Sequence, residues 1–325
     1  MIGEITLYRK YSDYLKEKYG EKIYKLPINL PITCPNRIDG KGCSFCADVG
    51  TGFEAMESTN SVSMQMNNTK ELICRKYKAK KFIAYFQNYT NTFMPIKQFT
   101  NYMHEAAQDQ DIVEISISTR PDCIREDYLI VLKDIHEQYH VDINIELGLQ
   151  TVNYHTLDNI NRGHGLAEFL DAVMRIKKYP FTICTHIILN LPQDTMRDVI
   201  ETAKILSAVQ IDIVKLHSLY IAKNTELARQ YKEGEIQICS KEEYINRVAT
   251  FIEYVSPDMV IERLFSRVPE DDSDFSNWGT SWWKLQDELL QKMNDENIYQ
   301  GKKFNYLNGR ALDKLWNLNQ KNQIF

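Results

Sequence analysis

The stretch "YKLPINLPITCPNRIDGKGCSFC", residues 24–46, joins a β-rich run to three closely spaced cysteines. Cys34, Cys43 and Cys46 are separated by eight and then two residues, and no fourth cysteine or any histidine occurs among residues 1–73. A structural zinc site and a cubane iron–sulfur cluster each normally take four protein ligands. Three thiolates would leave one iron of a cluster open to an outside ligand, and we favour this interpretation. Two alternatives remain: a zinc site completed by a distant residue, and cysteines buried as small apolar side chains.

Six β-rich runs lie along the chain, and segments with helical periodicity separate most of them. Ile, Val, Phe and Tyr dominate these runs, as in buried parallel strands. From the second run onward they recur about every 30 to 40 residues, which is the length of a βα unit. The predicted strands are residues 24–33, 81–87, 112–119, 142–150, 181–192 and 211–221.

This rhythm predicts an α/β fold, because repeated right-handed βαβ crossovers curl a parallel sheet toward a barrel. Six units make a partial TIM-type (β/α)6 barrel. A doubly wound open sheet is the alternative, since periodicity does not fix the order of the strands. The three cysteines follow directly on the first strand, so we expect them at the carboxyl end of the sheet, where barrel enzymes place their chemistry.

Three segments are predicted along the chain. Residues 1–23 form an N-terminal segment with a short amphipathic helix, and residues 24–230 form the partial barrel. Residues 231–325 form an extension that packs on the barrel. We expect this extension to be mostly helical, because residues 241–255 and 282–293 have helical periodicity.

The composition excludes some function classes. Among 325 residues, 39 basic and 44 acidic side chains give a net charge of −5, so the chain has no strongly basic footprint for nucleic acid. The basic stretch at 76–81 is interpreted as solvated surface. We find no signal-peptide pattern and no run of about 18 apolar residues that would span a membrane, so we predict a cytoplasmic protein without a membrane partner.

Five motifs, in this order along the chain, resemble the radical SAM superfamily and, within it, the YhcC-like group that is related to the elongator-type enzymes. A sixth short match near the C-terminus adds to them. The motifs are "GEKIYKLPINLPITCPNRIDGKGCSFC" (20–46), "AYFQNYTNTF" (84–93), "STRPDCI" (118–124), "ELGLQTVNYHTLDNI" with "NRGH" (146–164), "LNLPQDT" (189–195) and "IYQGKKF" (298–304).

The resemblance implies that Cys34, Cys43 and Cys46 hold a [4Fe–4S] cluster as thiolates, and that S-adenosyl-L-methionine (SAM) binds the fourth iron through its amino and carboxylate groups. Reductive cleavage of SAM would give a 5′-deoxyadenosyl radical that removes hydrogen from the substrate. An external one-electron donor such as flavodoxin or ferredoxin would reduce the cluster. The long first gap between the cysteines agrees with this branch of the superfamily.

The same resemblance indicates SAM-binding residues. The usual Gly-Gly-Glu after the second strand is absent and "FQNYTNT" stands in its place, so Gln87, Thr90 and Asn91 are candidates for binding the SAM amino group. Glu146 and Gln150 lie at alternate positions of the fourth predicted strand and share one face. They would bind the ribose hydroxyls of SAM, and a structural hydrogen-bonded pair is the alternative.

Four further residues are candidates for binding. Arg162 would pair with the SAM carboxylate, because a guanidinium offers a bidentate fork; a helix-capping or surface arginine is the alternative. Arg120, which ends the third predicted strand, and Lys215 and His217, which share one face of the sixth, are candidate substrate contacts. For Arg120 the alternative is a turn clamp with Asp122, and for His217 it is a side chain that fills the barrel.

We therefore expect a radical SAM enzyme. The resemblance to elongator-type enzymes implies tRNA as partner and modification of the C5 substituent of wobble uridine, from carboxymethylaminomethyl to aminomethyl. One alternative is radical chemistry on a small metabolite or peptide. Another is a non-catalytic, metal-stabilised module that binds RNA or protein.

Overall fold

Seven strands form one parallel sheet in the computed structural model, which describes residues 6–38, 40, 42–47, 55–267, 272–310 and 312. The strands are β1 (Tyr24–Ile28), β2 (Phe82–Phe86), β3 (Ile112–Thr119), β4 (Asp142–Gln150), β5 (Thr182–Ile188), β6 (Ile213–His217) and β8 (Val260–Arg263). Their order in the sheet is their order along the chain. A doubly wound sheet would reverse that order at one point, so the predicted partial barrel is confirmed and the alternative is wrong.

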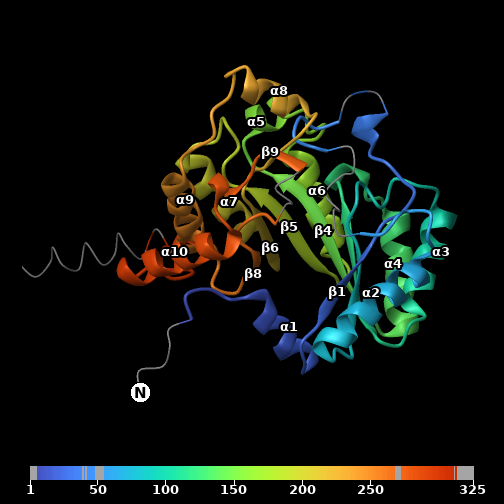
Figure 1. Ribbon diagram of the computed structural model, residues 1–325. Coiled ribbons are helices and arrows are strands. Elements are labelled where there is room, and N and C mark those ends of the chain that lie inside the picture. Colours follow the sequence, from blue (N-terminus) through green and yellow to red (C-terminus); the bar gives the residue numbers. More distant parts are fainter. Residues whose placement is uncertain are drawn as a thin grey trace, which may run out of the picture.

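Helices surround the sheet. They are α1 (Tyr11–Tyr19), α2 (Val62–Tyr77), α3 (Ile96–Ala107), α4 (Glu126–Tyr139), α5 (Tyr154–Asn159), α6 (Leu166–Ile176), α7 (Met196–Ala208), α8 (Glu226–Lys232), α9 (Lys241–Tyr254) and α10 (Trp282–Asp295). The helices α2, α3 and α4 lie on one flank, and α7 and α9 lie on the other (Figure 1). The helix α10 packs against α9. None of the described helices combines the length and apolar character needed to cross a lipid bilayer.

Side-chain caps fix where several helices begin. The hydroxyl of Ser240 accepts the N–H of Glu243 at the start of α9, and Ser61 does the same for Met64 in α2. Such caps satisfy backbone donors that have no partner within the helix. They therefore define the amino-terminal ends of α9 and α2.

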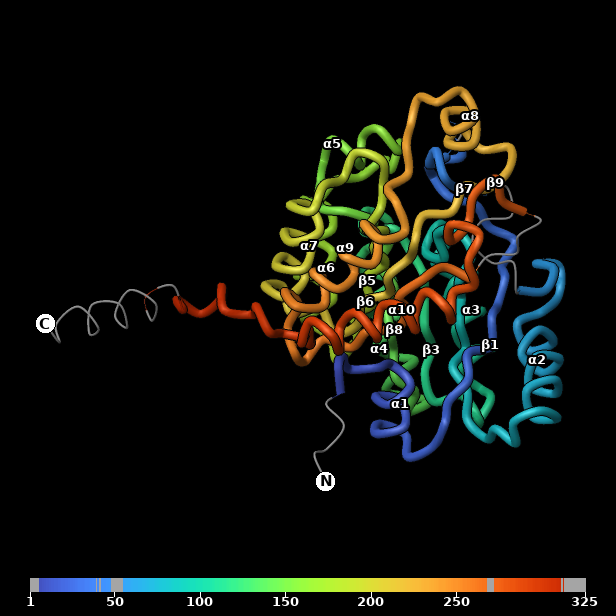
Figure 2. The backbone as a smooth tube through the Cα atoms, turned by 60° about the vertical axis from the view of Figure 1, so that its left-hand side comes forward, coloured from blue at the N-terminus to red at the C-terminus, as the bar shows by residue number. Residues whose placement is uncertain are grey.

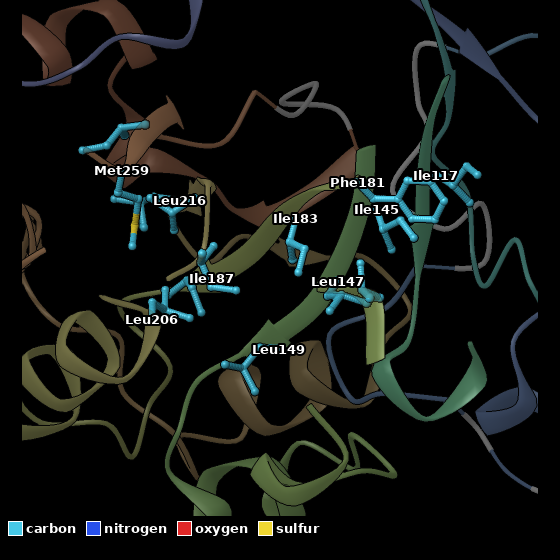
Figure 3. Packing of buried hydrophobic residues seen from close by; sticks show 14 of the residues in the cluster. Ile117, Ile145, Leu147, Leu149, Phe181, Ile183, Ile187, Leu206, Leu216 and Met259 are labelled. Carbon is cyan, nitrogen blue, oxygen red and sulfur yellow. The ribbon is translucent and has the colours of Figure 1, made fainter. Parts of the chain in front are cut away.

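The two faces of the sheet differ in polarity. Along β4 the side chains of Ile145, Leu147 and Leu149 are buried in the apolar layer beneath the helices (Figure 3). The alternate residues Asn144 and Glu146 are buried as well, but they are polar. Alternation along a strand sends these two sets to opposite faces. The outer face therefore supplies the hydrophobic core, and the inner face carries polar groups.

The helix α1 covers the end of the sheet opposite to α5 and α8 (Figure 1, Figure 2). Tyr11 and Tyr14 pack against Ile213 and Val260 at the amino-terminal ends of β6 and β8. Lys10, just before the helix, forms a bridge with Ile261 of β8. The N-terminal helix therefore closes the end of the half-barrel that lies away from the cysteines.

The main difference from the sequence prediction is a seventh strand, β8, in the segment expected to be a mostly helical extension. It pairs with β6 and completes the sheet. The sequence around it, "VIER", is short and half charged, which is why it gave no strand signal. The predicted sixth strand also divides into β6 and β7 (Ile221–Ala222), and β7 pairs with β9 (Ser273–Phe275).

Candidate active site

The three predicted cysteines line one cavity at the carboxyl end of the sheet, which we call the thiol cavity. A 3-10 turn (Pro35–Arg37) follows Cys34. Gly42 has a φ of +80°, which a residue with a side chain rarely adopts, and it turns the loop back toward Cys43. The thiol cavity is lined by Cys34, Arg37, Gly42, Cys43, Phe45, Cys46, Gln87, Tyr89, Thr90, Ser118, Thr119, Arg120, Glu146, Gly148, Gln150, Arg162 and His186.

Each of the three thiols lies beside a guanidinium group. The distances are 3.8 Å from Arg120 Nη1 to Cys34 Sγ, 3.4 Å from Arg162 Nη1 to Cys43 Sγ, and 3.4 Å from Arg37 Nη2 to Cys46 Sγ. Cations and N–H donors favour a thiolate, which is the form that binds metal. Burial raises the pKa of the Cys46 thiol and Arg37 lowers it in part. A bound metal would complete the deprotonation.

The three cavity sulfurs do not all lie within 4.8 Å of one another. Within the described residues, only Glu146, Cys184 and His186 bring three Cys, His, Asp or Glu ligand atoms within 4.8 Å of one another, so the three cavity sulfurs do not. A tetrahedral zinc ion at about 2.3 Å from each sulfur would hold the sulfurs about 3.8 Å apart. The spacing therefore fits a larger group held by three thiolates, such as an iron–sulfur cluster, and disfavours the zinc alternative.

Two buried hydroxyl groups in the thiol cavity, those of Thr90 and Ser118, have no hydrogen-bond partner within the described residues. A buried hydroxyl without a partner is costly, so it indicates a polar ligand at this place. Gly148 leaves room for Arg162, since a Cβ atom at residue 148 would lie 2.6 Å from Arg162 Nη2. The cavity thus fits a ligand with amino and carboxylate groups, as SAM has.

The structure brings two of the three candidates after β2 to the cavity. Gln87 and Thr90 line it, whereas Asn91 is fully buried behind it. The Asn91 amide donates hydrogen bonds to three backbone carbonyls, those of Phe86 (3.0 Å), Asn88 (3.1 Å) and Ser118 (2.9 Å). Asn91 therefore holds the loop that presents Thr90.

Arg120 and Arg162 both reach the thiol cavity. The predicted turn clamp is present, because Arg120 donates to both oxygens of Asp122, at 2.9 and 2.6 Å. Its remaining terminal nitrogen faces Cys34. Arg162 is only 7% exposed and donates to the carbonyl of Gly148 at 2.7 Å, so it is neither a surface nor a helix-capping arginine. Contacts of either arginine with SAM or substrate stay predictions.

A network of buried charged side chains lies at the base of the thiol cavity and centres on Glu146. Both oxygens of the fully buried Glu146 have partners, which are Lys25 Nζ (2.9 Å), Ser116 Oγ (2.8 Å), Tyr85 OH (3.1 Å), His186 Nε2 (2.6 Å) and Lys215 Nζ (3.2 Å). Burial alone would raise the pKa of Glu146, but Lys215, Lys25 and His186 hold it well below its ordinary value. The structural role is thus observed for Glu146, and its contact with a ribose stays a prediction.

The lysines of this network balance two carboxylates. Lys25 and Lys215 also contact Glu262 Oε1, at 2.8 and 3.1 Å. Because ammonium groups already hold Glu146, a metal ion bound by Glu146, Cys184 and His186 would meet two positive charges. We therefore interpret that set as part of the ion-pair network.

A second cavity adjoins the thiol cavity at the ends of β6 and β8, and we call it the β6–β8 cavity. Lys215 and His217 line it, as predicted for residues near the substrate, although their contact with a substrate is not established by this position. The ring of His217 stacks on that of His186, with centroids 5.3 Å apart. The lining residues are Phe45, Tyr85, Gln87, Gln150, His186, Ile188, Lys215, His217, Ser218, Leu219, Tyr220, Arg263 and Arg267.

Sequence reasoning missed five residues of this region: Lys25, Arg37, His186, Glu262 and Arg263. Alternation could have found His186, because it points to the same face of β5 as Cys184, two residues earlier. No such signal existed for Glu262 and Arg263, because their strand was not predicted.

The chain matches two family models. The model of the radical SAM superfamily covers residues 28–206, and the model of the radical SAM C-terminal domain covers residues 211–295. YtqA of Bacillus subtilis is 31% identical over 304 residues, which are 92% of this chain and 94% of YtqA. YhcC of Escherichia coli is 28% identical over 305 residues, 93% of this chain and 94% of that protein.

More distant similarities point to the elongator-type enzymes. The tRNA uridine(34) acetyltransferase of Methanocaldococcus jannaschii is 24% identical over 156 residues, 46% of this chain and 27% of that protein. The solved structure of Methanocaldococcus infernus Elp3 is similar in fold, with a TM-score of 0.66 and 16% identity. The match covers 86% of this chain and 64% of the Elp3 chain.

Proposed function

The chain belongs to the radical SAM superfamily, and from this premise we propose that it modifies the wobble uridine of tRNA, converting a carboxymethylaminomethyl group at C5 to aminomethyl. As a member of this family it is an enzyme that uses a [4Fe–4S] cluster and SAM, which sets aside the alternative of a non-catalytic module. When bound, these two groups supply a carbon radical that removes hydrogen from a substrate. An external donor provides the electron, and flavodoxin or ferredoxin is our proposal.

For a carboxymethylaminomethyl group, loss of one hydrogen atom and then of one electron, which would return to the oxidised cluster, would convert the C–N bond to an imine. Water would then hydrolyse the imine, leaving aminomethyl on the uridine and releasing the two-carbon group as glyoxylate.

The residues of the thiol cavity hold and orient these groups in our proposal. Cys34, Cys43 and Cys46 are the cluster ligands. Gln87 and Thr90 accept hydrogen bonds from the amino group of SAM, and the guanidinium of Arg162 pairs with its carboxylate. The ribose lies near Gln150 and Glu146.

The similarity to the tRNA uridine(34) acetyltransferase carries the proposal of tRNA as substrate. The name of that protein places its activity at uridine 34, the wobble position, and the similarity covers 46% of this chain. The fold similarity to archaeal Elp3 is consistent with it. A tRNA substrate also supports the predicted cytoplasmic location.

Mass spectrometry of tRNA nucleosides tests this function. Cells that lack the gene should accumulate carboxymethylaminomethyluridine and lose aminomethyluridine and its products. Complementation with the wild-type gene or with Cys239→Ala should restore the pattern, and Cys43→Ala should not. Unchanged nucleosides in the deletion strain would refute the proposal.

The charge of the chain favours one alternative, radical chemistry on a small metabolite or peptide. The net charge of −5 gives no general attraction to RNA. RNA binding at a local positive surface should weaken steeply with added salt. If a short molecule without folded RNA supports full turnover, and if tRNA binding does not respond to salt, the alternative replaces tRNA modification.

A further inference from the structure

Arg263 occupies an unusual place at the end of the sheet. The pairing of β6 and β8 shifts register between Val214 and Lys215, so that Lys215 pairs with Arg263. Such an irregularity re-aims side chains at the end of a strand. Glu262 reaches inward to the two lysines, and the next residue, Arg263, still lines the β6–β8 cavity. The register shift thus places two consecutive charged side chains at the interior.

Among the described residues, no acidic side chain forms an ion pair with Arg263. Lys25 and Lys215 are matched by Glu146 and Glu262, each lysine contacting both carboxylates. No ion pair or side-chain hydrogen bond of Arg263 is found across the described ranges. The lining residues of the β6–β8 cavity include no aspartate or glutamate. A partly buried guanidinium without a partner is costly, so its position calls for an anionic ligand.

His217 provides a second, independent observation. Its Nε2 atom is buried and has no partner within the described residues, although the ring lines the β6–β8 cavity. Burial lowers the pKa of His217, and the neighbouring His186, Arg263 and Lys215 lower it further. The imidazole is therefore neutral, and its free Nε2 donates a hydrogen bond in the tautomer that carries the proton on this atom. Two unsatisfied donor groups, one of them charged, face the same space.

We propose that the β6–β8 cavity is an anion subsite for the substrate, in which Arg263 binds a carboxylate or phosphate group and His217 donates a further hydrogen bond. The cavity shares Phe45, Gln87, Gln150 and His186 with the thiol cavity, so a ligand there lies next to the cofactors. The inference rests on the proposed function and deepens it. The carboxylate of a carboxymethylaminomethyl side chain and a phosphate of the RNA backbone are the two sources of such an anion.

The carboxylate of SAM is the competing anion. Arg162 lies beside Cys43, within the thiol cavity, where the resemblance places the carboxylate of SAM. Arg263 lies on the last strand of the sheet, whereas the cysteine loop follows the first. We therefore assign Arg263 to the substrate, and binding of SAM should not depend on it.

Binding to three anticodon stem-loops tests the subsite. They differ only at the wobble uridine, which is unmodified, aminomethylated or carboxymethylaminomethylated, and the protein is the anaerobically reconstituted enzyme. Wild type should bind the carboxymethylaminomethyl form roughly tenfold or more tightly than the aminomethyl form, as expected for a hydrogen-bonded ion pair. Arg263→Gln should lose this preference and Arg263→Lys should keep part of it. Arg75→Gln, an exposed arginine of α2, is the matched control and should bind like wild type.

Each other outcome has a defined meaning. Equal weakening of all three stem-loops by Arg263→Gln would identify the anion as a backbone phosphate. Unchanged binding of all three, or a loss of SAM affinity in Arg263→Gln, would overturn the subsite.

A second experiment measures thermal stability with small anions and needs no RNA. Inorganic phosphate and acetate should raise the Tm of wild type through binding to the folded state, and the rise should be absent in Arg263→Gln. If no stem-loop binds wild type but the rise depends on Arg263, the tRNA proposal fails and the subsite stands. If the rise is the same in both proteins, the subsite is refuted. Circular dichroism of each variant verifies its fold.

Discussion

At the thiol cavity each guanidinium has partners in the chain, whereas at the β6–β8 cavity Arg263 has none within the described residues. Arg120 and Arg162 contact backbone carbonyls as well as thiols, so their positions are fixed before any ligand arrives. Prearranged donors suit a resident group with a constant shape. A single unpaired charge suits a ligand that enters and leaves. The difference supports our proposal that the thiol cavity holds the cofactors and that the β6–β8 cavity binds the substrate.

Removing a cysteine should break the thiol cavity most severely. We expect Cys43→Ala to lower the iron and sulfide content of the reconstituted protein to background, because two thiolates cannot hold the cluster stably. Cys239→Ala is the control and should load normally, since Cys239 lies outside both cavities. Metal and sulfide analysis decides, and full loading of Cys43→Ala would contradict the ligand assignment.

Removing Glu146 should disturb both cavities together. Glu146→Gln leaves Lys25 and Lys215 with one carboxylate in place of two, and breaking a buried ion pair costs about 3–5 kcal/mol. Urea unfolding measures this loss. The control is Asp171→Asn, which removes an exposed pair with Arg175 and should cost less than about 1 kcal/mol. A loss as small as that of the control would show that the network does not support the sheet.

The same variant makes a prediction about pH. The pKa of Glu146 in the folded protein lies below its ordinary value of 4.5, despite burial, because Lys215 and Lys25 stabilise the carboxylate. Its contribution to stability is therefore complete above that value and is lost as the pH falls toward the folded pKa. The difference in unfolding free energy between wild type and Glu146→Gln should shrink below pH 4.5. A constant difference across the acid range would contradict this assignment.

Much of the thiol cavity could be predicted from the sequence, because its residues stand at the ends of strands with a clear pattern. The predicted strands 112–119 and 142–150 have the observed bounds of β3 and β4. Alternation along the predicted strand 142–150 leads to Glu146, and the spacing of the cysteines after the first strand leads to Cys34. Asn91 shows the limit of this reasoning. Asn91 lies in the loop that borders the thiol cavity, as expected, but its side-chain amide is hydrogen-bonded to backbone carbonyl oxygens. The sequence does not reveal these hydrogen bonds, because they form only when the loop is folded.

The β6–β8 cavity could not be predicted to the same extent. Lys215 and His217 belong to a predicted strand, but Arg263 belongs to a four-residue strand whose second half is charged. Its strand character comes from pairing with β6, which is a contact between distant parts of the chain. Tertiary pairing of this kind overrides local propensity. Arg37 was missed for a similar reason, since the loop must fold before it reaches Cys46.

Arg37 offers a finer test of the prearranged donors. Its Nη2 atom donates to Cys46 Sγ at 3.4 Å and to the Cys46 carbonyl at 2.9 Å. Donors to the sulfurs stabilise the more negative, reduced state of a cluster. Arg37→Leu should therefore lower the midpoint potential, on the order of tens of millivolts, and Arg37→Lys should lower it less. A redox titration followed by electron paramagnetic resonance measures the shift, and an unchanged potential would mean that the donor does not act on the cluster.

Gln150 gives the smallest expected effect and tests the boundary between the two cavities, since it lines both. Its φ of +80° is unfavourable for a residue with a side chain, and the pairing of β4 with β5 is irregular there. Gln150→Gly should stabilise the protein by up to about 1 kcal/mol through relief of this strain. Its affinity for SAM, measured by equilibrium dialysis, should fall at the same time. The matched control, Gln210→Gly, relieves a φ of +54° after α7 and should change stability alone. If Gln150→Gly keeps full SAM affinity, as the control does, the Gln150 side chain does not contribute to SAM binding and this prediction is wrong.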